Sequence, residues 1–369
     1  MQPFGNAGRR SMTLTADYDN HHDRGDSAST RRRGIVAVLT NPAADNGHGS
    51  HASRKAVAAL REACGRHGFA VVDVTGHSRD ESLENACRAI THAKALVVVG
   101  GDGMVSIGVN AVADCDVPLG VIACGSGNDF ARGVELPIGR IETSAEGIAA
   151  ALSYDSTIVL DLGHVRSPED GGHRIDTFFA GMLNCSIDAA INDRANQSRL
   201  PFGTLRYLEA GIREATHVGS YGFHVTVTND DHSVDDYDLL TPLLAIANAI
   251  YIGSGIQASP DSDLADGLLE MLWAKWLPTA PTALRILTKA YRGDHLDEPV
   301  IGYRRIRSIT ISATGEGKEP PVLMSDGECI GTLPVTVDVH SRALRLLVPP
   351  AAREHSNIVE DNRHTGEDH

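Results

Sequence analysis

Short apolar runs alternate with segments of helical spacing along the first third of the chain. Four runs predict strands, at Ile35–Thr40, Ala70–Thr75, Ala95–Val99 and Pro118–Ala123, and three segments between them predict helices, at Ala52–Cys64, Asp80–His92 and Val105–Ala113. Nearly continuous apolar strands that alternate with helices are typical of a parallel sheet covered on both faces. Ligands of such sheets bind beyond the carboxyl ends of the strands, and this is where the sequence places its glycines.

From about residue 157 the pattern changes to β-type runs that follow one another. The runs are Thr157–Val165, Thr177–Asn184, Tyr221–Thr228, Leu243–Tyr251, Leu268–Trp276, Ile306–Ser312 and Val335–Val339, and two helical segments, Gly203–His217 and Thr279–Tyr291, interrupt them. We therefore expect the α/β fold class, with a parallel-sheet α/β domain over residues 34–156 and a second, mostly antiparallel β domain over residues 157–335. The polar segments 1–33 and 352–369 are predicted to be disordered tails.

Composition and charge exclude several classes of protein. The chain has 369 residues, 42% of them hydrophobic and 22% charged, as in an ordinary globular protein. With 33 Lys and Arg against 48 Asp and Glu, its net charge of −15 argues against nucleic-acid partners, which require a basic face. The sequence contains neither an apolar run of about 18 residues, as a transmembrane helix requires, nor an apolar signal core. Its cysteines are scattered, so we expect reduced thiols in the cytoplasm.

The first candidate site follows the most apolar strand. Val97–Val99 runs into Gly100, Gly101, Asp102 and Gly103, and a helix follows. Glycine N–H groups together with a helix N-terminus form an anion site. A carboxylate in a phosphate loop is useful when it holds Mg²⁺, directly or through water, which makes Asp102 a candidate metal ligand. The alternative is a tight turn in which Asp102 only caps the helix.

A second loop repeats this pattern after the next strand. The segment Gly125–Asp129 has the sequence Gly-Ser-Gly-Asn-Asp. Phe130 excludes a GxGxxG dinucleotide fingerprint, and the chain has no Walker A motif. Two adjacent Gly/Asp turns at the same sheet edge therefore predict a nucleoside triphosphate with Mg²⁺.

Several later segments join these two loops in a family resemblance. They are Pro118–Ile122, Phe130–Ala131, Asp161–Gly163, Tyr251–Gly255, Asp266–Glu270 and Ser325–Glu328. In this order, over about residues 34–350, the set resembles the bacterial soluble diacylglycerol kinase, or lipid kinase, family. Asn192–Asn196 and Pro201–Tyr207 look most similar to mycobacterial members. Gly-Gly-Asp-Gly alone is shared with NAD kinases and phosphofructokinases, whereas the ordered set is far more specific.

The resemblance implies a two-domain enzyme that binds ATP and its acceptor lipid between the α/β domain and a β-sandwich. The last strands, about residues 336–350, would return to the first domain. The implied nucleotide contacts are Asn41, Pro42, Thr75, Gly100, Gly101, Asp102, Gly103, Met104, Ser106, Gly125, Ser126, Gly127 and Asn128.

The resemblance also implies two metal sites. In the first, Asp102, Asp129 and Asp161 form a carboxylate network that holds the active-site Mg²⁺ through water. The second, structural Mg²⁺ site consists of Asp263, Asp266 and Leu268, with Asp266 giving its carboxylate and two ligands being backbone carbonyls. For Asp266 the alternative is a turn cap.

Asp326 and Glu328 match the turn that supplies the general base of the family. Phosphoryl transfer needs positioning, charge neutralisation and a base near the acceptor hydroxyl, and either carboxylate could serve because they flank Gly327 at i and i+2. The choice between them stays open, with Asp161 as the next candidate and a plain hairpin turn as the alternative.

The sequence departs from the family pattern at two places. Met104 stands where the family usually has Thr, and replacing it by Thr should be neutral or mildly activating for turnover because it restores a hydroxyl. The loop after Asn41 lacks the usual Ser-Gly-Lys, and the candidates for its cation are His48, His51, Arg54 and Lys55.

The predicted function is that of an ATP- and Mg²⁺-dependent lipid kinase. It would phosphorylate the hydroxyl of diacylglycerol to give phosphatidic acid for phospholipid biosynthesis, as a cytoplasmic protein in peripheral contact with the inner membrane face. The rivals are a kinase of another acceptor, a sphingosine-like lipid or NAD, and a catalytically impaired lipid- or nucleotide-binding protein. A homodimer is left open. Trp273 and Trp276 are predicted to lie in the core, with a lipid-facing role as the alternative.

Overall fold

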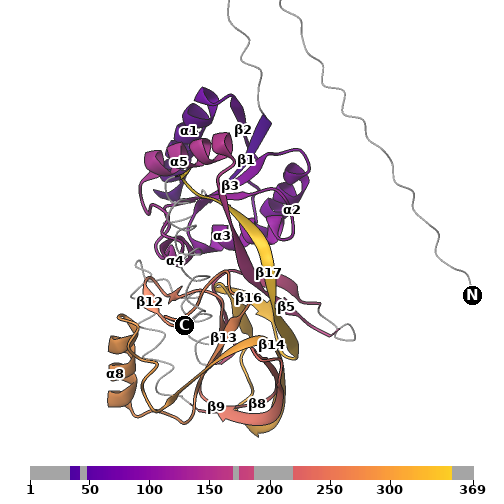
Figure 1. Ribbon diagram of the computed structural model, residues 1–369, viewed down its shortest axis with the longest axis vertical. Coiled ribbons are helices and arrows are strands. Elements are labelled where there is room, and N and C mark those ends of the chain that lie inside the picture. Colours follow the sequence, from indigo (N-terminus) through magenta and orange to yellow (C-terminus); the bar gives the residue numbers. More distant parts are fainter. Residues whose placement is uncertain (1–33, 42–47, 169–173, 187–218, 351–369) are drawn as a thin grey trace, which may run out of the picture. The chain divides into compact units, whose positions relative to one another are not determined.

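The computed structural model describes residues 34–41, 48–168, 174–186 and 219–350 (Figure 1). The helices are α1 His48–Arg66, α2 Arg79–Ile90, α3 Asp102–Val112, α4 Asp129–Gly133, α5 Ile141–Tyr154 and α8 Ala280–Ala290. The strands are β1 Gly34–Thr40, β2 Phe69–Asp73, β3 Ala95–Gly100, β4 Leu119–Ala123, β5 Thr157–Arg166, β6 Asp176–Phe179, β7 Met182–Asn184, β8 Tyr221–Asn229, β9 Val234–Thr241, β10 Leu244–Ala247, β11 Tyr251–Ile252, β12 Ile256–Gln257, β13 Leu269–Ala274, β14 Ile301–Gly317, β15 Leu323–Ser325, β16 Glu328–Gly331 and β17 Val335–Leu347. Across these residues, no helix combines the length and the apolar character needed to span a bilayer.

The first four strands form the parallel part of the sheet, in the order β4-β3-β1-β2. Successive residues of β1 point to opposite faces. Val36 and Val38 pack in the cluster that contains α1 and α5, whereas Ala37 and Leu39 pack in the cluster that contains α2 and α3. Because both faces are covered, the buried strand β3 is apolar almost throughout.

The antiparallel part continues the same sheet in the order β16-β15-β7-β10-β13-β14-β17, and β8 and β9 extend from β14. Its core includes the fully buried side chains of Phe179, Phe223, Ile246, Leu269 and Ile309. The predicted fold class, a parallel α/β part followed by a mostly antiparallel β part, is therefore confirmed. All described residues fall in one compact unit, so the domain boundaries at residues 156 and 335 stay predictions.

The long strand β17 joins the two parts (Figure 1). Near its start, Val335–Asp338 pairs antiparallel with β14, and near its end Leu346 pairs parallel with Leu119 of β4. It also pairs antiparallel with β5, with a register shift between His340 and Leu344. Arg342 lies in this irregular segment with a left-handed backbone, at φ 60°.

Several sequence predictions differ from the structure. The run Thr177–Asn184 is two strands, β6 and β7, which are interrupted at Ala180 and Gly181. Helix α5 and strand β9 were not predicted. The predicted helix Gly203–His217 lies outside the described residues. Trp273 packs against the core, but the core prediction for Trp276 is wrong, because this side chain is 52% exposed.

Candidate active site

The two glycine loops touch each other at the carboxyl ends of β3 and β4. A Cβ atom built on Gly125 would lie 2.4 Å from the Cα atom of Gly101, and one built on Gly101 would lie 3.2 Å from the Cα atom of Gly125. Only glycine permits two backbones to approach this closely. Because Gly101 is also the N-cap of α3, the contact brings the second loop to the N-terminus of that helix.

Asn128 sets the shape of the second loop. Its backbone is left-handed, at φ 57°, a conformation that Asn tolerates better than most residues. Its side-chain oxygen accepts a hydrogen bond from the Gly125 N–H at 2.9 Å, and its side-chain amide donates to the Gly125 carbonyl at 2.6 Å. These two bonds close the turn and leave Ser126 exposed.

Asp102 and Asp129 approach the same point of this loop. A Cβ atom built on Gly127 would lie 2.7 Å from Oδ2 of Asp102 and 3.6 Å from Oδ2 of Asp129. The Asp129 carboxylate also accepts hydrogen bonds from the N–H groups of Ser254 and Gly255, at 2.9 and 2.8 Å, so the turn of the separate β11–β12 hairpin also holds it.

The electrostatics of these two carboxyl groups favour a cation between them. Burial raises the pKa of Asp102 above its ordinary value of 3.8, although a hydrogen bond from the Phe130 N–H at 3.1 Å opposes the shift. Burial also raises the pKa of Asp129, and the negative charge of Asp102 adds to it. Two half-desolvated carboxylates that face one gap offer the hard oxygen ligands that Mg²⁺ prefers.

Asp326 begins the turn between β15 and β16 and is held by backbone amides. Its Oδ2 accepts from the Ala180 N–H at 2.9 Å, and its Oδ1 accepts from the N–H groups of Gly181 and Met182 at 2.9 and 3.0 Å. Burial raises the pKa of Asp326 to about 6, against the effect of these three donors, and the charge of Asp102 raises it further. The break between β6 and β7 therefore coincides with the N–H groups that bind the Asp326 carboxylate.

Glu328 lies over the first glycine loop. Its Oε1 would be 3.4 Å from a Cβ atom built on Gly103, and it is 3.4 Å from Nη1 of Arg79. Arg79 also donates from Nη2 to the Ser106 hydroxyl at 3.0 Å, so it links Glu328 to the first turn of α3. The Glu328 side chain remains 41% exposed, whereas the Asp326 carboxylate is fully engaged.

Sequence reasoning missed Arg79. The available signal was its position, because Arg79 begins α2 four residues after Thr75, at the same carboxyl edge of the sheet as the glycine loops. Thr75 itself bonds to the end of β1, where its hydroxyl accepts from the Thr40 N–H at 2.9 Å. Asn41 follows β1 directly and its carbonyl faces the Ser53 hydroxyl at 3.4 Å, whereas Pro42 lies outside the described residues.

Asp161 lies against the Asp266 turn. Its two carboxylate oxygens accept from the N–H groups of Gly267 at 2.7 Å and Arg342 at 2.6 Å. These bonds tie β5 to that turn and to the irregular segment of β17, and the role of Asp161 in a water-mediated Mg²⁺ network with Asp102 and Asp129 stays a prediction. A direct three-carboxylate cluster of Asp102, Asp129 and Asp161 is not among the potential metal groups of the described residues.

The predicted second metal site is a polar turn. Asp263 accepts from the Ala265 N–H at 3.1 Å, and Asp266 accepts from the Leu268 N–H at 3.0 Å. The other oxygen of Asp266 pairs with Arg305. Burial raises the pKa of Asp266, and Arg305 opposes this shift. An arginine thus competes with any metal for this carboxylate.

Two departures from the family pattern have clear positions. Met104 is a buried core side chain that lies on Gly100, where a Cβ atom would be 2.6 Å from its Cγ. The substitution to Thr would remove this packing and should therefore lower stability, whereas its effect on turnover stays a prediction. Among the candidate cations, Lys55 is paired with Glu142 of α5 at 2.8 Å, while the side chains of His51 and Arg54 are exposed.

Comparison with known proteins gives two family matches. The profile of the "Diacylglycerol kinase catalytic domain" matches residues 35–162. The profile of the "YegS C-terminal NAD kinase beta sandwich-like domain" matches residues 181–348.

Individual relatives carry the same description. A diacylglycerol kinase of Mycobacterium tuberculosis is 29% identical over 328 residues, which cover 88% of this chain and 99% of the relative. A diacylglycerol kinase of Bacillus subtilis is 25% identical over 67% of this chain and 75% of the relative. The crystal structure of a putative diacylglycerol kinase from Bacillus anthracis shares the fold, with a TM-score of 0.65 at 20% identity over 89% of this chain and 99% of that one.

Proposed function

We propose that this chain is a kinase of the diacylglycerol kinase family, whose catalytic-domain profile matches residues 35–162, and that it transfers the γ-phosphoryl group of ATP to the hydroxyl of diacylglycerol, giving phosphatidic acid. The observation that carries the proposal is the contact between the two glycine loops at the N-terminus of α3, with Asp102 and Asp129 on one side and Glu328 on the other.

The loops and the helix N-terminus bind the phosphates. Glycine backbones leave their N–H groups open to a ligand, and the positive end of the α3 dipole adds to the attraction for negative charge. Any side chain at Gly101 or Gly125 would push the loops apart. The same residues therefore give the site its shape and its charge.

Asp102 and Asp129 are the residues that would hold Mg²⁺. They fit this ion because both offer buried carboxylate oxygens, and their raised pKa values reflect a burial of negative charge that the neighbouring N–H donors only partly offset. Bound Mg²⁺ supplies neutralisation of the charge on the transferring phosphate. Asp161 binds the Asp266 turn and stays a candidate for the water-mediated network, and Asp266 stays a candidate ligand of a second Mg²⁺ in competition with Arg305.

Glu328 is the better candidate for the general base. Asp326 has both oxygens occupied by three amide donors, so its role is to fix the turn. Glu328 is half-exposed next to Gly103, where an acceptor hydroxyl could meet the phosphate, and Arg79 orients it. In this scheme Glu328 accepts the proton of the lipid hydroxyl while the phosphate loops hold ATP.

The acceptor is a membrane lipid, so the proposal includes peripheral contact of a cytoplasmic protein with the inner membrane face. A kinase assay with labelled ATP and diacylglycerol, a sphingosine-like lipid or NAD as acceptor tests it. We expect labelled phosphatidic acid to dominate. Label transfer chiefly to another acceptor would overturn the choice of lipid. Tight ATP binding without transfer to any acceptor would favour the catalytically impaired binding protein.

A further inference from the structure

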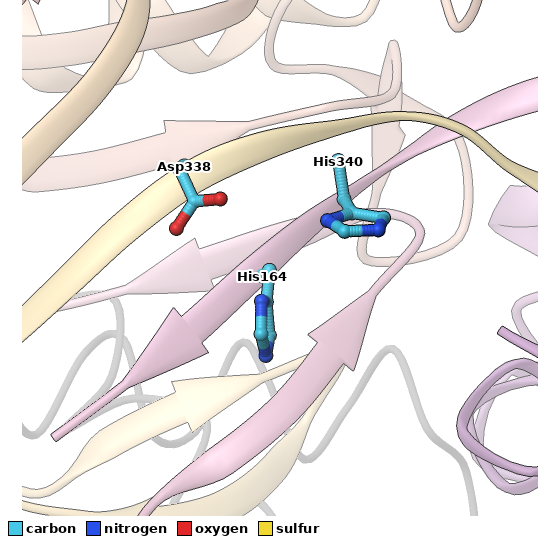
Figure 2. Close-up of side chains that lie close together, drawn as sticks. All are labelled: His164, Asp338 and His340. Carbon is cyan, nitrogen blue, oxygen red and sulfur yellow. The ribbon is translucent and has the colours of Figure 1, made fainter. Parts of the chain in front are cut away.

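A pair of histidines and an aspartate gather on the surface of β5 and β17, outside the candidate active site. His164 of β5 is the register partner of Asp338 of β17, and His340 stands two residues further along the same face of β17. One ligand atom from each of the three side chains lies within 4.8 Å of the others. Figure 2 shows these three side chains lying close together on β5 and β17.

Two further carboxylates orient the imidazole rings. Nε2 of His164 lies 2.8 Å from Oδ1 of Asp176, and Nε2 of His340 lies 2.8 Å from Oδ1 of Asp114. When Nε2–H donates to a carboxylate, the proton stays on Nε2 and Nδ1 keeps its lone pair. A carboxylate behind each histidine is the arrangement that fixes metal-binding imidazoles in proteins.

Packing holds both rings in place before any ligand binds. The His164 ring stacks on Phe178 with centroids 4.3 Å apart and planes inclined by 12°. The His340 ring meets His164 and Phe178 edge-on, at 5.8 and 5.5 Å. Little side-chain freedom would therefore be lost on coordination.

We propose that His164, His340 and Asp338 form a site for a divalent transition metal, with Zn²⁺ as the best match. The ligands are Nδ1 of each histidine and one oxygen of Asp338, whose other oxygen pairs with Arg166. Two imidazoles and a carboxylate favour Zn²⁺, Co²⁺ or Ni²⁺ over Mg²⁺. The metal would fasten β5 to β17 just before the irregular segment in which Arg342 donates to Asp161.

The test measures metal binding by the full chain. Wild-type protein stripped with chelator and reloaded should retain about one more Zn²⁺ than His164→Asn or His340→Asn, and its Tm should rise with Zn²⁺ by mass action more than the Tm of either variant. Because exposed Cys87 and Cys329 can bind zinc adventitiously, the difference between proteins is the measure. Asp114→Asn should weaken Zn²⁺ binding roughly 10–100-fold without removing a ligand.

His224 provides the matched control. It is another histidine of the sheet, and its Nδ1 and Nε2 face Asp238 and Asp236 at 2.7 and 3.3 Å. His224→Asn should keep the wild-type zinc content and Tm response. Equal zinc retention by wild type, His164→Asn and His340→Asn would overturn the site, as would a Tm of wild type that does not respond to Zn²⁺. Asp338→Asn, which preserves the shape of the side chain, covers the case in which a histidine variant does not fold.

A second surface rests on a different observation. Of the eleven large hydrophobic side chains that the structure shows as exposed, five lie in or beside α8: Trp276, Leu277, Leu284, Leu287 and Tyr291. We call these five residues the α8 surface. The opposite side of the helix is covered, because Ile286 packs against Val300 and Ile301.

The charge around the α8 surface is opposite to that of the protein. The segment from Lys275 to Gly293 contains four cations, Lys275, Arg285, Lys289 and Arg292, and no acidic residue, in a chain of net charge −15. Arg285 and Lys289 also pair with Glu298. An amphipathic helix with exposed Leu side chains, preceded by an exposed Trp and bordered by cations, has the composition of segments that lie in the interface of an anionic bilayer.

We infer that the α8 surface docks on an anionic lipid bilayer. This inference deepens the proposed function, since it names the surface through which the kinase would reach its lipid. Vesicle binding tests it without any kinase activity, so the two can fail separately. If the chain has no kinase activity toward lipid, vesicle binding through the α8 surface is still expected.

The experiment compares sedimentation with vesicles that contain or lack anionic lipid. We expect binding only to anionic vesicles. The double variant Leu284→Ser/Leu287→Ser should weaken this binding roughly tenfold or more, the order expected when two leucine side chains no longer insert into the bilayer. Val234→Ser/Leu240→Ser removes two exposed apolar side chains of β9 and should bind as wild type. Equal vesicle binding by both double variants would overturn the inference. It would also be overturned if the α8 variant lost self-association of the protein but kept its vesicle binding.

Discussion

Gly125→Ala tests the contact on which the candidate site depends. The new Cβ atom would lie 2.4 Å from the Cα atom and 2.7 Å from the N atom of Gly101, whereas ordinary contact begins at 3.4 Å. The obstacle is backbone, which cannot rotate away, so the two loops must separate by about 1 Å. Overpacking of this kind costs about 1–3 kcal/mol of stability. A displacement of about 1 Å in a group that positions a substrate costs on the order of 10²-fold in rate.

The assay is kcat with saturating ATP and lipid, together with Tm. Gly65→Ala is the matched control, because Gly65 lies in α1 with no atom within 4 Å of its built Cβ. Alanine there should keep kcat and stabilise the helix by about 0.5–1 kcal/mol. Wild-type kcat and Tm in Gly125→Ala would refute the contact between the loops. Lower stability with wild-type kcat would refute the link between loop separation and phosphate positioning.

Four further predictions follow from the geometry. Glu328→Gln should lower kcat by roughly 10²–10⁴-fold and leave the Kd of ATP and the Tm unchanged, and a normal kcat would exclude Glu328 as the base. Met104→Thr should lower the free energy of unfolding by about 1–3 kcal/mol in urea titrations, because Met104 is a buried side chain against Gly100, and an unchanged value would contradict this packing. In the absence of nucleotide, the Tm of wild type should rise with Mg²⁺ and that of Asp266→Asn should rise less, and no response in wild type would remove the second metal site. Burial raises the pKa of Glu270 from 4.5 to about 7, so the folded chain keeps this proton over a pH range in which the unfolded chain has lost it. The free energy of unfolding should therefore fall by on the order of 3 kcal/mol as pH rises through that window. In metal-free urea titrations at pH 5 and 8, Glu270→Gln should lose this part of the pH dependence. An equal change between the two pH values in wild type and variant would refute the shift.

The parallel part of the fold and the glycine loops were predictable from sequence. Strands β1 and β3 are buried on both faces, and such strands are apolar without interruption. Glycine in a loop indicates a close backbone approach, and Gly101 and Gly125 make such an approach. What the sequence could not show was that these two particular glycines meet each other.

The antiparallel part was less predictable because its irregularities come from distant contacts. The break between β6 and β7 depends on Asp326, which lies 146 residues after Ala180. Strand β9 was not predicted because acidic residues occupy exposed positions in its alternating pattern and because few of its positions are fully buried. Arg79 escaped for a related reason, since its partner Glu328 comes from the other end of the chain.

The same distance effect gives the Asp-Gly-Glu turn its meaning. Asp326 has a left-handed backbone, at φ 47°, and Gly327 follows at φ 83°. Nothing lies within 4 Å of a Cβ atom built on Gly327, so glycine is favoured at this position by the left-handed backbone and not by lack of space. The three amides that hold Asp326 therefore fix a turn whose exit sends Glu328 toward Gly103. We therefore infer different roles for the two carboxylates: Asp326, which accepts three backbone hydrogen bonds, anchors the turn, and the more exposed Glu328 is the candidate base.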